Sequence, residues 1–154
     1  MTATEDTAND LLRAAARLSR WASQSASFDM PFAQARLLAL IDELGPVRIS
    51  TLATADHSSQ PTVTSQVQRL ETAGWVSRES DPADARATLV SLTPHGDVAL
   101  HQVRVARAKV LDPTLARLGG DGLARTRAAI DVLTELLDLT ADPIPAPAPA
   151  RKDI

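Results

Sequence analysis

The sequence predicts a mainly α-helical fold with one small β-hairpin. Apolar residues recur at helical spacing in several segments, and serine, threonine, proline and glycine mark the ends of those segments. Two short apolar segments in the middle of the chain flank a polar turn, which is typical of a hairpin. With 154 residues, 44% hydrophobic and 23% charged, the chain fits one soluble domain with its own core.

Two helices are expected in the first third of the chain. Residues 1–7 are interpreted as a flexible N-terminus, and residues 8–26 as a helix. The apolar stripe of this helix consists of Leu11, Ala15, Leu18 and Ala22. Asp29 is the expected N-cap of the second helix, and Gly45 with the following proline ends it.

A short helix, a turn and another helix are expected next. After a very short strand at 47–49, Ser50 is expected to cap a helix of little more than one turn. The sequence "DHSS" then forms a turn, and Ser58 or Ser59 caps a helix that ends at Gly74. The inward stripe of this helix is formed by Val63, Val67 and Leu70.

A hairpin with a polar tip is expected after this helix. Strands at 75–78 and 88–92 flank the turn-forming sequence "SDPADA". Thr93 as N-cap and Pro94 at the first helical position then open a long helix.

The C-terminal part of the chain is expected to hold two helices and a tail. The sequence "GGDG" ends the helix that begins at residue 94, at about residue 117. The last helix, at about 121–139, carries apolar residues on more than one side and is expected to bury two faces. Residues 141–154 alternate proline with alanine, so we expect a disordered tail outside the fold.

The composition argues against several classes of protein. The chain has no cysteine, and its three histidines show no metal-ligand spacing, so neither metal nor cofactor is expected. A Gly-rich phosphate loop and a nucleophile elbow are both missing, so we expect no enzyme. No apolar run reaches membrane-spanning length and the N-terminus lacks a basic start, which predicts a cytoplasmic protein without membrane contact. The net charge of −3 counts mildly against nucleic-acid binding.

The order of the expected elements is that of a helix-turn-helix followed by a wing. Within "LATADHSSQPTVTSQVQRLETAGWVSRESDPADARATLVSLTPHG", the chain resembles the MarR family of bacterial transcriptional regulators. The matching residues are Leu70, Glu71, Gly74, Asp81, Pro82, Asp84, Arg86 and Leu92 to Gly96. The resemblance covers about residues 8–140 and implies a winged helix-turn-helix, at about 30–93, flanked by N- and C-terminal dimerisation helices at about 8–26 and 94–140.

The resemblance implies a homodimer that binds double-stranded DNA at a pseudo-palindromic operator, as a repressor released by a small ligand. The helix after the turn would enter the major groove, and the wing would reach the adjacent minor groove. Side chains able to contact bases or phosphates on this helix are Ser59, Gln60, Pro61, Thr62, Thr64, Ser65, Gln68 and Arg69. On the wing, Arg86 would reach the minor groove while Asp84 holds its guanidinium.

Two departures from the family pattern remove basic residues. Ala85 stands where relatives often have a second wing arginine, and Ser65 where they often have a basic residue. Each change removes a cationic contact, so DNA binding is expected to be weaker or more dependent on base contacts. The alternative is a winged-helix interaction or dimerisation module without specific DNA binding, in which the polar helix face is a solvated surface and the wing ion pair an ordinary one.

Many members of the family release DNA when a small aromatic or anionic molecule binds between the dimerisation helices and the winged helix. By this resemblance, the candidate pocket residues are Arg17, Trp21, Phe28 and Arg36. Trp21 has an alternative role in packing. Because cysteine is absent, sensing through a thiol is excluded.

Overall fold

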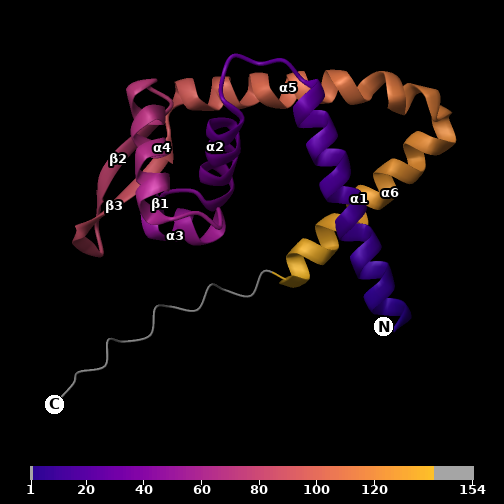
Figure 1. Cartoon of the computed structure of the whole chain (residues 1–154), viewed down its shortest axis with the longest axis horizontal. Helices are drawn as coiled ribbons and strands as arrows, with labels where there is room; N and C mark the ends of the chain where they lie inside the picture. The colour runs from indigo at the N-terminus through magenta and orange to yellow at the C-terminus, as the bar shows by residue number, and fades with distance from the viewer. Residues whose placement is uncertain (1, 141–154) are drawn as a thin grey trace. The chain divides into compact units, whose positions relative to one another are not determined.

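The structure, a computed structural model, describes residues 2–140, and the chain divides into two compact units at residues 111 and 112. Figure 1 shows the helices and the small sheet. The elements are α1 (Ala3–Ser25), α2 (Phe32–Leu44), β1 (Val47–Arg48), α3 (Ile49–Ala55), α4 (Gln60–Thr72), β2 (Val76–Asp81), β3 (Asp84–Leu92), α5 (Pro94–Arg117) and α6 (Gly119–Thr140). The expected mainly helical fold with a hairpin is confirmed.

The first two helices begin at other residues than expected. The Thr2 side chain accepts a hydrogen bond from the Glu5 backbone, and Glu5 accepts one from the Thr2 backbone. This capping box starts α1 at Ala3, so residues 3–7 are helical rather than a flexible segment. The N-cap of α2 is Pro31, without a side-chain hydrogen bond, so the prediction of Asp29 as the cap was wrong.

The core of the first unit lies among α2, α3, α4 and the sheet. Its largest fully buried side chains are Leu38, Ile41, Leu52, Leu70, Leu100, Val63, Val67 and Val90. The predicted inward stripe of α4 is therefore confirmed. Ser59 is the N-cap of α4, since its side chain accepts a hydrogen bond from the Thr62 backbone. Ser50, however, lies inside α3 rather than at its cap, because Arg48 occupies that position.

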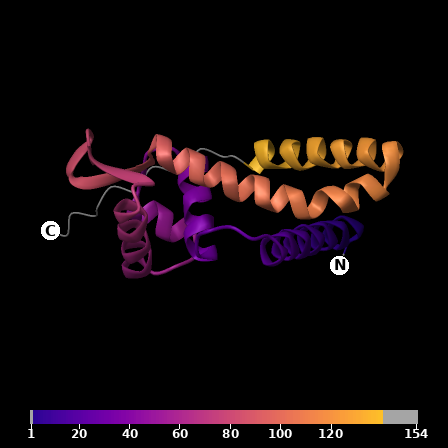
Figure 2. The ribbon, with the colours of Figure 1, turned by 90° about the horizontal axis from the view of Figure 1, so that it is seen from above.

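The sheet has three antiparallel strands in the order β1-β3-β2. Its hairpin is longer than expected, because the strands continue to Asp81 and Asp84, which lie opposite each other. The turn consequently shrinks to Pro82 and Ala83, and Arg86 lies on β3 rather than in a turn. The hairpin extends outwards beyond the helices α2, α3 and α4 (Figure 1 and Figure 2).

The start of α5 closes against the base of the hairpin. The Thr93 hydroxyl accepts a hydrogen bond from the Gly96 backbone at 3.0 Å and donates one to the Gly74 carbonyl at 2.6 Å, which confirms the predicted cap. A Cβ atom at Gly96 would lie 1.9 Å from the Trp75 carbonyl oxygen. Only glycine therefore allows this close approach between α5 and the hairpin.

In the second unit, α5 ends at Arg117 as expected, and α6 begins two residues before the expected start at about residue 121. Gly119 is the first residue of α6, and its positive φ of 68° allows the chain to turn between α5 and α6. A Cβ atom at Gly122 would lie 2.3 Å from the Leu118 Cβ, so this glycine is packed within the bend. The expected tail at 141–154 lies outside the described residues. Among residues 2–140, no helix is long and apolar enough to cross a membrane.

The apolar side chains of α6 are exposed in the single chain. The exposed large residues are Leu123, Ile130, Val132, Leu133, Leu136, Leu137 and Leu139. They form two stripes on neighbouring sides of the helix, one with Ile130, Leu133 and Leu137 and the other with Val132, Leu136 and Leu139. Such a large exposed apolar surface is typical of a protein interface.

Candidate functional site

The outer face of α4 is polar and open to solvent. Most of the residues of α4 and its N-cap that are expected to contact DNA are exposed, namely Ser59, Gln60, Pro61, Thr62, Ser65, Gln68 and Arg69. Thr64 is half-buried, and its hydroxyl donates to the Gln60 carbonyl at 2.8 Å. Arg69 takes part in none of the ion pairs found among residues 2–140. One face of α4 therefore anchors the helix in the core while the other offers hydrogen-bonding groups and a cation.

The wing presents Arg86 to solvent. Its side chain is 95% exposed, and its Nε lies 3.5 Å from the Asp84 Oδ1. The same Asp84 oxygen accepts a hydrogen bond from the Arg86 backbone at 3.1 Å. Asp84 thus shapes the backbone of β3 and attracts the guanidinium only loosely.

A second arginine–aspartate pair connects β1 to the turn of the wing, and the sequence analysis missed it. Arg48 Nε donates to Asp81 Oδ2 at 2.7 Å, and Arg48 Nη2 donates to the same oxygen. The Ala83 backbone N–H and the Arg48 guanidinium hold the pKa of Asp81 below its ordinary value of 3.8, so the carboxylate stays charged at neutral pH. The two residues are 33 positions apart, and although Asp81 belongs to the family motif, nothing in the sequence paired it with Arg48.

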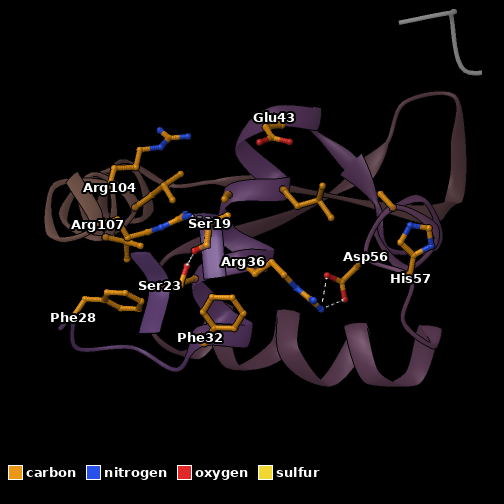
Figure 3. Close-up of a pocket in the computed structure, with 16 residues that line it drawn as sticks. Ser19, Ser23, Phe28, Phe32, Arg36, Glu43, Asp56, His57, Arg104 and Arg107 are labelled. Atoms are coloured by element: carbon orange, nitrogen blue, oxygen red, sulfur yellow. Dashed lines mark hydrogen bonds and ion pairs between the residues drawn. The ribbon is translucent and has the colours of Figure 1, made fainter. Parts of the chain in front are cut away.

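A pocket of about 450 Å³ lies in the first unit, lined by α1, α2, α5 and the end of α3 (Figure 3). Two of the predicted pocket residues, Phe28 and Arg36, line it. Arg17 and Trp21 are not among its lining residues, and Arg17 instead lines a separate hollow on α1 with Arg13 and Arg20. The pocket residues of α1 are Ser19 and Ser23, one helical turn apart, and side chains two positions from these point to the opposite side of the helix.

The pocket holds three arginines, and two of them have carboxylate partners. The Arg36 Nη2 lies 2.8 Å from the Asp56 Oδ1, and the Arg104 Nη2 lies 2.6 Å from the Asp42 Oδ2. Arg107 instead donates to the Ser19 hydroxyl at 3.0 Å, and Figure 3 shows it reaching towards that serine. The Arg107 Nε is buried without a hydrogen-bond partner.

The aromatic side chains of the pocket are Phe28 and Phe32, whose rings are labelled in Figure 3. The sequence analysis missed Phe32, Arg104 and Arg107. The two arginines are three positions apart on α5, which places them on one face of the helix. This spacing was the feature of the sequence that could have indicated a shared site.

A helix-turn-helix with a polar outer face, followed by a hairpin with an exposed arginine, is the architecture of winged-helix transcriptional regulators. The MarR family model matches residues 32–88. An uncharacterised HTH-type transcriptional regulator of Mycobacterium leprae is 30% identical over 132 residues, which cover 85% of this chain and 92% of that protein. The chain belongs to the MarR family.

Solved structures agree with this assignment. A protein of Pseudomonas aeruginosa described as a transcriptional regulator is 30% identical, with a TM-score of 0.69 over 89% of this chain and 98% of that one. A mutant MarR of E. coli complexed with operator DNA shares the fold, with 22% identity and a TM-score of 0.56 over 80% and 93% of the two chains. The predicted family and fold are confirmed, and a transcriptional regulator is favoured over an interaction module.

Proposed function

We propose that the chain is a homodimeric, sequence-specific DNA-binding repressor that acts in the cytoplasm. In this proposal α4 lies in the major groove, and the β2–β3 hairpin brings Arg86 to the flanking minor groove. The two copies would bind half-sites about one helical turn apart, roughly 10 base pairs, on a pseudo-palindromic operator.

One observation carries the proposal: α4 buries one face completely and leaves the opposite face free for a ligand. Val63 and Val67 are at most 1% exposed, whereas Gln60, Ser65 and Gln68 face solvent. Amide and hydroxyl groups of this kind can bond to base edges. The same fold was solved in complex with operator DNA in the MarR mutant of E. coli.

The exposed apolar surface of α6 supports the homodimer. Leu137 is 69% exposed and Leu139 is 76% exposed in the single chain. Covering such side chains with the same surface of a second copy removes them from water, and closed two-fold dimers are the commonest oligomers. A two-fold dimer also presents two copies of α4, which a palindromic operator requires.

The experiment that tests DNA binding is a fluorescence anisotropy titration with the DNA upstream of the protein's own gene. Arg69 and Arg86 from two copies supply four cations, so the logarithm of affinity should fall with the logarithm of salt concentration with a slope of roughly −4. A duplex of shuffled sequence, equal in length and composition, is the control. Equal affinity for both duplexes at every salt concentration would contradict sequence-specific binding.

We also propose that the pocket binds a small aromatic anion that releases the DNA. Two phenylalanine rings can pack against an aromatic group, and Arg107 has a buried Nε without an acceptor. A carboxylate would supply that acceptor, and a charge-assisted hydrogen bond would form. The volume of about 450 Å³ suits a small molecule.

Benzoate and its uncharged analogue benzamide test this pocket by calorimetry. We expect benzoate to bind at least roughly tenfold more tightly than benzamide, and Arg107→Met to remove that preference, because the charged hydrogen bond is lost. Arg127→Met, on the exposed polar side of α6, is the matched control and should bind benzoate like the wild type. The proposal fails if Arg107→Met binds benzoate with unchanged affinity or if benzamide binds equally well.

A further inference from the structure

The outer part of the wing is a ribbon of only two strands. β1 pairs with β3 only at Val90 and Leu89, so the hairpin from residue 80 to residue 88 has no third strand beside it. Two-stranded ribbons twist strongly and are only marginally stable alone. The direction in which Arg86 points therefore depends on what holds this ribbon to the rest of the molecule.

Among the side-chain hydrogen bonds and ion pairs of the described part of the chain, those of one residue pair connect residues 80–88 to an element outside the hairpin. It is the pair of Arg48 and Asp81. The other ion pair of the ribbon, Arg86 with Asp84, lies within a single strand. A third pair, Arg78 with Glu71, lies at the base of the hairpin at 3.0 Å.

The geometry of the Arg48–Asp81 pair suits a role in holding the wing. Asp81 Oδ2 accepts both hydrogen bonds from Arg48, while its Oδ1 accepts the Ala83 backbone N–H at 2.8 Å. One buried carboxylate, with 9% of its side chain exposed, thus fixes the turn of the hairpin and the guanidinium at once. Charged hydrogen bonds that are shielded from water restrain geometry more strongly than exposed ones.

Arg48 also lies at the start of the helix-turn-helix. It is the last residue of β1 and the N-cap residue of α3, so its backbone belongs to the same unit as α3 and α4. Since β3 lies between β1 and β2, the Arg48 side chain reaches from the edge of the sheet to the far strand of the hairpin. The pair thereby links the orientation of the wing to that of the helices.

We propose that Arg48 is a positioning residue for DNA binding, which through Asp81 holds the wing so that Arg86 meets the minor groove while α4 occupies the major groove. This inference rests on the proposed DNA-binding function. Arg48 itself contacts no DNA in this role. The contribution of Arg48 to affinity is therefore expressed only through Arg86.

A double-mutant cycle tests this dependence with the anisotropy assay. Arg48→Ala should weaken binding roughly five- to tenfold in the wild-type background and change it little in the Arg86→Ala background. In the Gln60→Ala background the full loss should remain, because α4 does not depend on the wing contact. Arg48→Lys keeps the charge and should recover part of the affinity. A general loss of stability would lower affinity equally in all three backgrounds, and that result would overturn the proposal.

Hydrogen exchange without DNA separates this inference from the proposed function. In Arg48→Ala, amide exchange should rise across residues 81–88 and stay unchanged across α4. Unchanged exchange in the hairpin would show that the pair does not hold the wing, even if the wild type binds DNA. A wild type that binds no DNA would instead refute the proposed function and the positioning role with it, whatever the exchange shows.

Discussion

Replacing Leu133 and Leu137 with glutamate is expected to convert the protein to a monomer and to reduce its affinity for operator DNA by a factor of at least roughly 100. Both residues lie on one stripe of α6, and both are exposed in the single chain. In the proposed dimer each carboxylate would be buried without a partner, which costs several kcal/mol. A monomer engages one half-site and loses the gain from simultaneous binding of two, which is roughly 100- to 10,000-fold.

Light scattering measures the mass of the variant, and anisotropy measures its affinity. Arg127→Glu is the matched control, since it places a carboxylate on the polar side of the same helix and also lowers the net charge by two. We expect this control to remain a dimer and to keep the sequence preference of the wild type. A double glutamate variant that stays dimeric would show that α6 is not the interface. A folded monomer with undiminished affinity would contradict the need for two copies.

The second large effect is expected for Arg86→Ala. This change should weaken the free energy of specific DNA binding by about 1 to 3 kcal/mol and make the affinity less dependent on salt concentration. The side chain is almost fully exposed, so its removal should barely change the stability of the fold. Because narrow minor grooves attract arginine, the loss should be larger on operators with A·T-rich flanks. Gln60→Ala should instead relax base preference and leave the salt slope unchanged.

The affinity is measured at several salt concentrations with the purified dimer. Arg127→Ala removes an exposed arginine of α6, which belongs to neither α4 nor the wing, and should leave the salt slope near that of the wild type. If Arg86→Ala binds its operator with unchanged affinity and unchanged salt dependence, the wing is a solvated hairpin, and DNA binding must rest on α4 alone.

The two pairs of charged residues on the wing differ in how far they could be predicted. Asp84 and Arg86 are two positions apart within a motif of the family, so they could be proposed from the sequence alone. Arg48 and Asp81 are brought together by the pairing of three strands. In the sequence, Asp81 was a residue of the family motif within a turn-forming segment, and Arg48 was a residue of a short strand, without a sign that the two would pair.

The pocket residues likewise divide into those that could be predicted from the sequence and those that could not. Phe28 and Arg36 were predicted from the resemblance and line the cavity, whereas Arg17 and Trp21 lie elsewhere. An amphipathic pattern identifies the apolar side of a helix, but a pocket is lined by whichever side faces a gap between several helices. That gap depends on how α1, α2 and α5 meet, and the pattern of a single helix contains no such information.

The sequence by itself determined the helix-turn-helix, a serine cap of α4 at Ser58 or Ser59, the buried stripe of α4 and the start of α5 at Thr93 and Pro94. These features depend on interactions among residues within about four positions of each other, and such interactions leave a periodic or capping pattern in the chain. The tertiary structure alone decided the length of the hairpin, the Arg48–Asp81 pair and the place of Arg104 and Arg107 in the pocket. Each of these requires segments distant in the chain to meet, and their contacts arise only when the core closes and the strands pair.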